Sequence, residues 1–253
     1  MKKIILLNKK EGETPLEALD RFRMANPKYK DEKMTYAGRL DPMASGVLLV
    51  LVGEEIKQKD KYLALNKEYE FEILFGFATD TYDILGKVVH SNILTNIGMS
   101  ELEKMVKNNL KNFIGQFKQQ YPLYSSKTVK GKPLFMYGRS NVKVKLPQRE
   151  IKVHSLKFLK LKKISNKKLL TNIEKRIKKV EGDFRQKEIL KIWNQALNVK
   201  HSVFNINIVS FKIKCSSGTY VRGIANSLGN KIDIPALAFS IKRTKIGKWS
   251  IKG

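Results

Sequence analysis

The loop of residues 36–46 contains the first side chain that could do covalent chemistry, the carboxylate of Asp41. The loop is rich in small residues and comes directly before a continuous apolar run. Functional groups concentrate on loops held by rigid strands, and Pro42 disfavours a helical backbone at Asp41. A carboxylate in this place could act as a nucleophile. From spacing alone, a turn in which Asp41 bonds its own backbone is the simpler interpretation.

A second candidate is the turn of residues 215–223, which passes from a strand into a helix. Backbone N–H groups at a helix start can hold a phosphate. Tyr220 would offer a stacking face there, and Arg222 a fixed cation. An ordinary helix start with Tyr220 in the core fits the same residues, so both interpretations stay open.

A third candidate is the stretch of residues 120–127, where Tyr121, Tyr124 and Lys127 occur among small residues. Aromatic and basic side chains interleaved in this way are typical of proteins that bind single-stranded or looped RNA. A surface loop with incidental aromatic residues is the alternative, and it is the one that this stretch alone would favour.

The charge of the chain points to a polyanionic partner. The 253 residues include 50 Lys and Arg but only 23 Asp and Glu, which gives a formal net charge of +27. Nucleic acid is the expected partner, although an AT-rich genome would also enrich Lys, Ile and Asn. The amphipathic, basic segment 165–197 either contacts RNA or presents a solvated face. Its basic residues include Lys167, Lys168, Lys175, Arg176, Lys178 and Lys179.

Composition also excludes several classes of site. Cys215 is the one cysteine, so no internal disulfide can form, and with three histidines beside it a structural zinc site is not expected. The apolar start, residues 1–7, is too short for a signal peptide or a bilayer span, and we interpret it as a strand. We therefore expect a cytoplasmic protein with no membrane segment and no metal.

Hydrophobic patterning predicts an α+β fold with one large mixed or antiparallel sheet flanked by helices. Capping boxes at Thr14 and Ser100 predict helices running to Phe22 and about Phe113. Strands are expected at 46–53, 69–73 and 203–214. Residues 54–65 and 165–197 read as helical, and a helix should follow the turn 217–219 and end near Gly229.

Four segments resemble, in order, the motifs of a known family. Residues 38–48 are similar to the catalytic loop of the TruB family of bacterial tRNA pseudouridine synthases, which reads Gly-Thr-Leu-Asp-Pro-Leu-Ala-Thr-Gly. Residues 67–86 resemble its second motif, and residues 120–127 its Gln-x-Pro-Pro-x-Tyr-Ser-Ala-x-Lys stretch. Residues 215–222 resemble its Cys-Ser-x-Gly-Thr-Tyr-x-Arg turn. The resemblance extends from about Ile4 to Trp249.

The resemblance implies the catalytic fold of pseudouridine synthases. It also implies an enzyme that isomerises uridine to pseudouridine in tRNA, at position 55 of the T-arm loop, without a cofactor. It assigns the nucleophile to Asp41 and the residue that stacks on the extruded base to Tyr69. Extruding a base costs a few kcal/mol, which contacts in the site must offset. Arg222 would keep the Asp41 carboxylate ionised. The matched substrate-binding residues are Tyr36, Asp83, Lys127 and Tyr220.

The chain also departs from the family pattern. Tyr36 stands where the family has a histidine, and Arg39 where it has a small residue. Residues 9–12 read Lys-Lys-Glu-Gly in place of Lys-Pro-x-Gly. Many family members carry a C-terminal RNA-binding domain of PUA type. Because the chain stops at Gly253, we expect residues 1–253 to form a single catalytic domain, without a PUA domain, that acts as a monomer on tRNA.

Two alternatives remain open at this stage. Arg39 gives the loop the Arg-Leu-Asp form of related uridine isomerases that act on ribosomal RNA. The stretch 120–127 and the turn 215–222 are instead of the tRNA type. A tRNA-binding or tRNA-folding protein without catalysis is the other alternative. The retention of Asp41, Tyr69 and Arg222 argues against it, since binding alone requires none of them.

Overall fold

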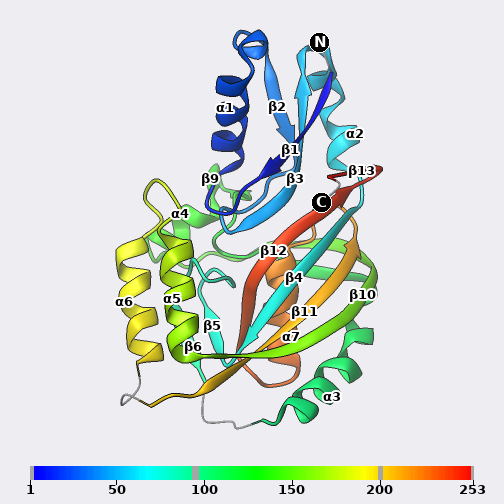
Figure 1. The fold of residues 1–253 in the computed structure, drawn as a ribbon. Coiled ribbons are helices and arrows are strands. Elements are labelled where there is room, and N and C mark those ends of the chain that lie inside the picture. Colours follow the sequence, from blue (N-terminus) through cyan, green and yellow to red (C-terminus); the bar gives the residue numbers. More distant parts are fainter. Residues whose placement is uncertain (1–2, 93–96, 199–201, 252–253) are drawn as a thin grey trace.

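The computed structural model describes residues 3–92, 97–198 and 202–251, and one large mixed sheet dominates it (Figure 1). The sheet order is β1 (Ile4–Lys9), β3 (Ala44–Val52), β12 (Ala236–Ile246), β4 (Lys67–Phe75), β11 (Asn205–Cys215), β10 (Gln148–Ser165) and β7 (Gly115–Gln120). β2 (Met34–Ala37) pairs with β3, and β13 (Trp249–Ser250) pairs with β12. β3 and β12 are parallel, whereas the other neighbours are antiparallel. The predicted α+β class is confirmed.

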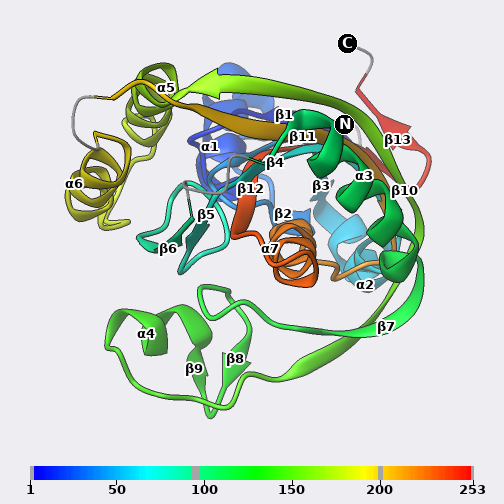
Figure 2. The same ribbon diagram turned by 90° about the horizontal axis from the view of Figure 1, so that it is seen from below.

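The helices pack around this sheet in separate groups. α7 (Val221–Lys231) and α3 (Met99–Leu110) share one apolar cluster with β4, β11 and β10, and α7 lies in the hollow of the curved sheet (Figure 2). α5 (Asn166–Ile177) and α6 (Gln186–Leu197) form a second cluster around Trp193. α1 (Pro15–Ala25) and α2 (Lys59–Leu63) flank β1, β2 and β3.

Short elements complete the fold. β5 (Phe77–Thr79) pairs with β6 (Val88–Ser91), and β8 (Thr128–Val129) pairs with β9 (Lys132–Pro133), which α4 (Leu134–Arg139) follows. Short 3₁₀-helices occupy Pro27–Tyr29, Gly53–Gln58 and Lys111–Phe113. Within the described part of the chain, no helix is both long and apolar enough to cross a membrane.

Local sequence explains the elements nearest the candidate site. Eight of the nine residues of β3 are buried, as the apolar run predicts for a strand inside a sheet. The first residues of β4 alternate between buried and more exposed positions, so Tyr69 faces the core. Before α1, Thr14 and Glu17 form the predicted capping box, with Glu17 N donating to Thr14 Oγ1 at 3.2 Å.

Two details of the predicted helices were wrong. α3 begins at Met99 after Gly98 and has no side-chain cap, so Ser100 does not form a capping box. The segment 165–197 is two helices, because Gly182 and Arg185 both adopt positive φ, at 78° and 63°. We did not predict the 18-residue strand β10, which precedes this helix pair. The predicted first strand begins at Ile4, and Met1 and Lys2 lie outside the described residues.

Arg176 differs from its basic neighbours on α5. Its side chain is buried, with Nη2 donating to Glu11 Oε2 and to the carbonyl of Phe239, each at 2.7 Å. Its guanidinium also lies over the Phe239 ring, 4.7 Å from the centroid. Lys175 and Lys178, by contrast, are exposed. Arg176 therefore joins the helix pair to the sheet and is not available to RNA.

Replacing Arg176 tests this division. Arg176→Gln should lower the free energy of unfolding by about 2–4 kcal/mol, because Glu11 and the Phe239 carbonyl lose a charged, buried partner. Lys175→Gln on the same helix should change it by less than about 0.5 kcal/mol. Urea unfolding of both variants measures the two values. Similar losses in both would contradict the structural role of Arg176.

Candidate active site

Asp41 lies in the loop that joins β2 to β3, and its carboxylate is paired with Arg222 from the first turn of α7. Arg222 Nε donates to Asp41 Oδ2 at 2.8 Å, and Nη2 lies 3.5 Å from Oδ1. The Arg222 side chain is 3% exposed, whereas the Asp41 side chain is 39% exposed. The buried guanidinium of Arg222 therefore orients the Asp41 carboxylate, which remains partly accessible to solvent.

The same guanidinium connects three segments of the chain. Arg222 Nη1 donates to the carbonyl of Thr81 at 2.7 Å, and Nη2 donates to the carbonyl of Tyr124 at 2.9 Å. Burial alone would lower the pKa of Arg222, but the nearby carboxylates of Asp41 and Asp83 raise it above its ordinary value. Arg222 therefore stays charged and fixes the Asp41 loop against both neighbouring loops.

Two further cations hold the backbone of the Asp41 loop. Lys9 is fully buried, and its Nζ donates to the carbonyls of Ala44 at 2.5 Å and Pro42 at 3.3 Å. Arg243 is buried too, and it donates to the carbonyls of Gly38 and Arg39, each at 3.2 Å. Burial lowers the pKa of Lys9 to about 8, against the raising effect of Glu13 and Asp41. Both ends of the loop are thus fixed.

Sequence analysis missed both of these residues. For Lys9 a signal was present, since residues 9–12 occupy the place of the family's Lys-Pro-x-Gly stretch. The last residue of that stretch, Gly12, also supports the loop, because its N–H donates to the carbonyl of Pro42 at 2.9 Å. Arg243 carries no such signal, because it lies among lysines in a strand and its burial depends on tertiary packing.

Asp41 borders a cavity of about 250 Å³ that also contains Tyr69 and Tyr220. Tyr69 comes from β4 and is buried, and this burial raises the pKa of its hydroxyl. Tyr220 precedes α7, is half-buried, and meets the ring of Tyr121 edge-on at 5.6 Å. The cavity has basic walls, with Arg39, Lys67, Arg149 and Arg243 among its lining residues.

Asp83 is buried behind Arg222 and is held by its own turn. Its Oδ1 accepts hydrogen bonds from Thr81 Oγ1 at 2.8 Å and from Leu85 N at 2.9 Å. Burial raises the pKa of Asp83 to about 6, although Arg222 acts in the opposite direction. Asp83 therefore supplies negative charge to Arg222 at neutral pH from a position that is 6% exposed.

A second cavity, of about 340 Å³, lies on the other side of Asp41. Tyr36 lines it from β2, and Arg185 and Phe184 line it from the connection between α5 and α6. Arg185 stacks on Tyr124 at 4.2 Å and pairs with Asp80 at 2.7 Å. The basic helix pair therefore reaches the site through Arg185, which sequence analysis did not single out.

Lys127 is the predicted residue that the structure does not bring into either cavity. Its side chain is exposed, and its Nζ lies 5.6 Å from the centre of the Tyr121 ring.

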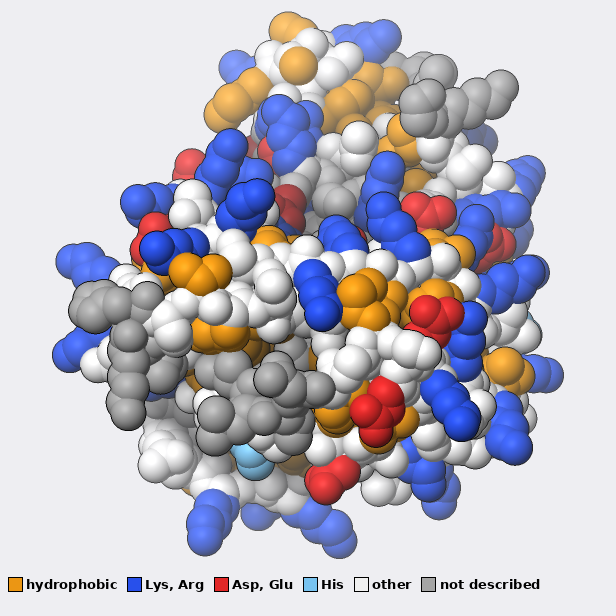
Figure 3. Space-filling view, turned by 60° about the horizontal axis from the view of Figure 1, so that its bottom comes forward, with side chains coloured by type: hydrophobic (Ala, Val, Ile, Leu, Met, Phe, Trp, Pro, Cys, Tyr) orange, Lys and Arg blue, Asp and Glu red, His pale blue; other side chains and the backbone are white. Residues whose placement is uncertain are grey.

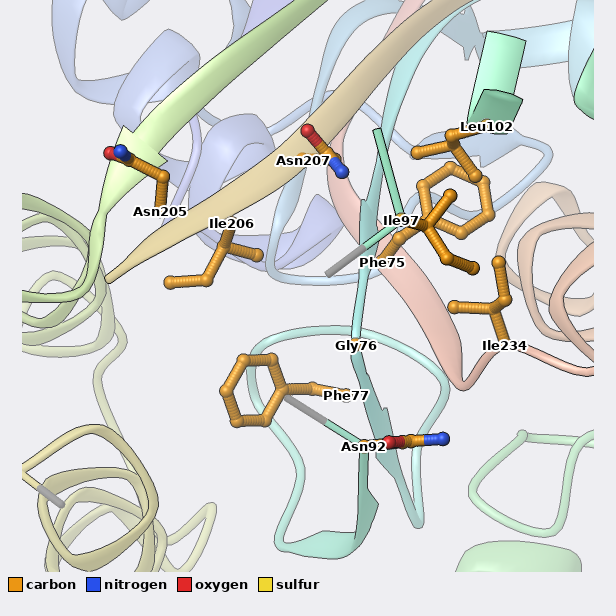
Figure 4. Close-up of a pocket in the computed structure, with 10 residues that line it drawn as sticks. All are labelled: Phe75, Gly76, Phe77, Asn92, Ile97, Leu102, Asn205, Ile206, Asn207 and Ile234. Carbon is orange, nitrogen blue, oxygen red and sulfur yellow. The ribbon is translucent and has the colours of Figure 1, made fainter. Parts of the chain in front are cut away.

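A third and much smaller pocket, of about 40 Å³, lies between β4, β5, β6 and β11 (Figure 4). None of its ten lining residues borders the cavities at Asp41. This small pocket is therefore separate from the site around Asp41.

Two solved structures share the fold of this chain. A Cbf5–Nop10–Gar1 complex aligns with a TM-score of 0.57 and 19% identity, over 98% of this chain and 50% of that chain. An H/ACA ribonucleoprotein bound to a substrate RNA containing 2′-deoxyuridine aligns with a TM-score of 0.54 and 17% identity. At these identities the likeness concerns the fold alone.

Sequence comparison gives the family. Residues 26–182 match the profile of the TruB family pseudouridylate synthase, N-terminal domain, and the chain belongs to this family. The tRNA pseudouridine synthase B of Clostridium kluyveri is 28% identical over 98% of this chain and 68% of its own length. That of Clostridium tetani is 29% identical over 94% of this chain and 66% of its own length. The chain thus spans about two thirds of these relatives and half of the solved chain.

The raised pKa of Asp83 leads to a prediction about stability. The carboxyl group of Asp83 has a pKa of about 6 in the folded chain, against an ordinary value of 3.8. The protonated group therefore stabilises the folded state fully below pH 3.8, and this contribution is lost as pH rises through 6. Asp83→Asn cannot lose a proton. Its unfolding free energy relative to the parent protein should therefore rise by up to about 3 kcal/mol between pH 4 and 7.

Urea unfolding of the parent protein and the Asp83→Asn variant at several pH values in this range measures the difference. A difference that stays constant with pH would show that the folded-state pKa of Asp83 is ordinary.

Proposed function

We propose that this chain isomerises uridine to pseudouridine in tRNA, with Asp41 as the nucleophile. The single observation that carries the proposal is the Asp41–Arg222 pair, in which a half-open carboxylate is fixed by a buried cation at a cavity that contains Tyr69. Membership of the TruB family supports the reaction, and eight of the similar proteins, each 27–29% identical to this chain, are named tRNA pseudouridine synthase B.

The reaction balances without an external reactant. The bond between N1 of uracil and C1′ of ribose breaks, the base turns, and a bond from C5 to C1′ forms, while the proton lost from C5 is matched by one gained at N1. No electron is transferred to another molecule, so the chemistry requires no cofactor. Attack on C1′, attack on C6 and removal of the 2′ proton would all start from the same carboxylate at Asp41.

The neighbours of Asp41 have separate tasks in this proposal. Arg222 orients the carboxylate of Asp41, and Asp83 supplies a second negative charge behind Arg222. Tyr69 would stack on the extruded uracil from the wall of the cavity. Tyr36 would fill the space that the base leaves, a task for which an aromatic face suffices.

An RNA substrate fits the charge of the site and of the whole chain. Lys and Arg side chains are spread over the face in Figure 3 and are more frequent there than Asp and Glu. Such charge supplies affinity for phosphates but no sequence specificity. We propose the T-arm loop as target, because looped RNA is recognised through shape and extruded bases. The monomeric state and the cytoplasmic location expected from the sequence stay predictions.

Asp41→Asn should lower the rate of isomerisation at least a hundredfold, a loss of about 2.7 kcal/mol in transition-state stabilisation, because an amide cannot replace the nucleophile. Affinity for tRNA should change little, since the shape is almost unchanged. The measurement is pseudouridine formed in unmodified tRNA, with binding determined separately. Asp31→Asn, in an exposed turn before β2, is the matched control and should keep full activity.

A non-catalytic RNA-binding protein would form no pseudouridine even at high concentration. An Asp41→Asn variant that keeps more than about a hundredth of the rate would exclude covalent catalysis by Asp41.

A T-arm stem-loop alone should serve as substrate, because recognition depends on the loop and not on the rest of the tRNA. The test compares pseudouridine formation in the isolated stem-loop, in whole tRNA and in ribosomal RNA fragments. Activity on ribosomal RNA without activity on the stem-loop would favour the alternative that Arg39 suggests.

A further inference from the structure

Arg39 lies two residues before Asp41, and its side chain is exposed at the mouth of the site. Its Nη1 donates to Ser126 Oγ at 2.7 Å, across the gap between the Asp41 loop and the loop 121–127. No ion pair found within residues 3–92, 97–198 and 202–251 involves Arg39. Among these residues, the Arg39 guanidinium is therefore paired with a neutral hydroxyl and with no carboxylate.

The Arg39–Ser126 contact stands where the two cavities at Asp41 meet. The cavity that contains Tyr69 and the cavity that contains Tyr36 have five lining residues in common, and these form the boundary between them. The shared residues are Arg39, Leu40, Asp41, Ser125 and Ser126. The hydrogen bond therefore bridges the boundary between the two cavities, to which Asp41 also belongs.

The backbone of Arg39 is fixed although its side chain is exposed. Its carbonyl accepts a hydrogen bond from the buried Arg243, and Gly38 before it has a φ of 91°, in the left-handed region that favours glycine. The guanidinium can therefore change partner without moving the Asp41 loop. If RNA brings a nucleotide to Asp41, as in the proposed function, its phosphates would approach the part of the cleft that Arg39 lines.

We propose that Arg39 is a phosphate-binding latch, closed on Ser126 in the free protein and transferred to a phosphodiester beside the target nucleotide when RNA binds. A guanidinium binds a phosphate through charge-assisted, often bidentate hydrogen bonds, which are about twice as strong as bonds between neutral partners. The exchange of Ser126 for a phosphate is therefore favourable. This inference rests on the proposed function for the presence of RNA in the cleft.

The test uses T-arm stem-loops that each carry one neutral methylphosphonate at a linkage near the target uridine. The protein should bind one of these RNAs roughly ten- to a hundredfold more weakly than the all-phosphate RNA, because a charged contact is lost. Arg39→Gln should bind the all-phosphate RNA more weakly by a similar factor. At that same linkage, methylphosphonate should cause the Arg39→Gln variant no further loss.

The salt dependence and two further variants sharpen the result. Arg39→Gln should reduce the log–log salt slope by about 0.7, the value for one phosphate contact in single-stranded RNA. Ser126→Ala removes the closed latch and keeps the cation, so it should bind as tightly as the parent protein or more tightly. Lys157→Gln removes one exposed charge at a residue that lines neither cavity, and should leave affinity and slope unchanged.

The proposal is overturned if every methylphosphonate weakens the parent protein and Arg39→Gln by the same factor, or if Ser126→Ala weakens binding as much as Arg39→Gln. Pseudouridine formation by the parent protein is measured on the same all-phosphate RNA. RNA binding with the expected coupling but no pseudouridine would refute the proposed reaction and leave the role of Arg39 intact.

Discussion

The site depends on one buried guanidinium. Arg222 has a side chain that is 3% exposed, and a buried cation without partners would cost several kcal/mol. Its three nitrogens donate to Asp41 and to the carbonyls of Thr81 and Tyr124, which come from three separate loops. Because Arg222 must be satisfied, these loops are held at fixed positions. The same contacts that stabilise the cation therefore define where the carboxylate of Asp41 lies.

Lys9 and Arg243 extend this principle to the backbone. Each is buried and donates to carbonyls in or beside the Asp41 loop, so the loop is held by three cations while carrying one carboxylate. Preorganised charges of this kind do not need to rearrange when charge develops during a reaction. Removal of one of them would leave unpaired carbonyls and a less firmly held Asp41, so we expect any effect on chemistry to act through the position of its carboxylate.

The residues predicted from the sequence were those carried by contiguous motifs. Asp41, Tyr69 and Tyr220 border one cavity, and Arg222 borders the other beside Asp41. The apolar run of β3 and the alternation of β4 also predicted their elements, because one buried face sets a simple periodicity. The burial of Arg243 was not predictable, since its environment comes from strands distant in sequence. The charge pattern of the sequence also could not show that Arg176 is buried while Lys175 is exposed, because the partners of Arg176, Glu11 and Phe239, are distant in sequence.

The connection between α5 and α6 links the basic helix pair to the chemistry. Arg185 donates to the hydroxyl of Tyr124 and stacks on its ring, and the carbonyl of the same tyrosine accepts a hydrogen bond from Arg222. Arg185 holds this position in the left-handed region, at a φ of 63°, which a non-glycine residue adopts only when its contacts compensate for the strain. A shift of the helix pair would therefore act on Tyr124 and on Arg222 together. Arg185, Tyr124 and Arg222 thus link the connection between α5 and α6 to the orientation of the Asp41 carboxylate through packed side chains.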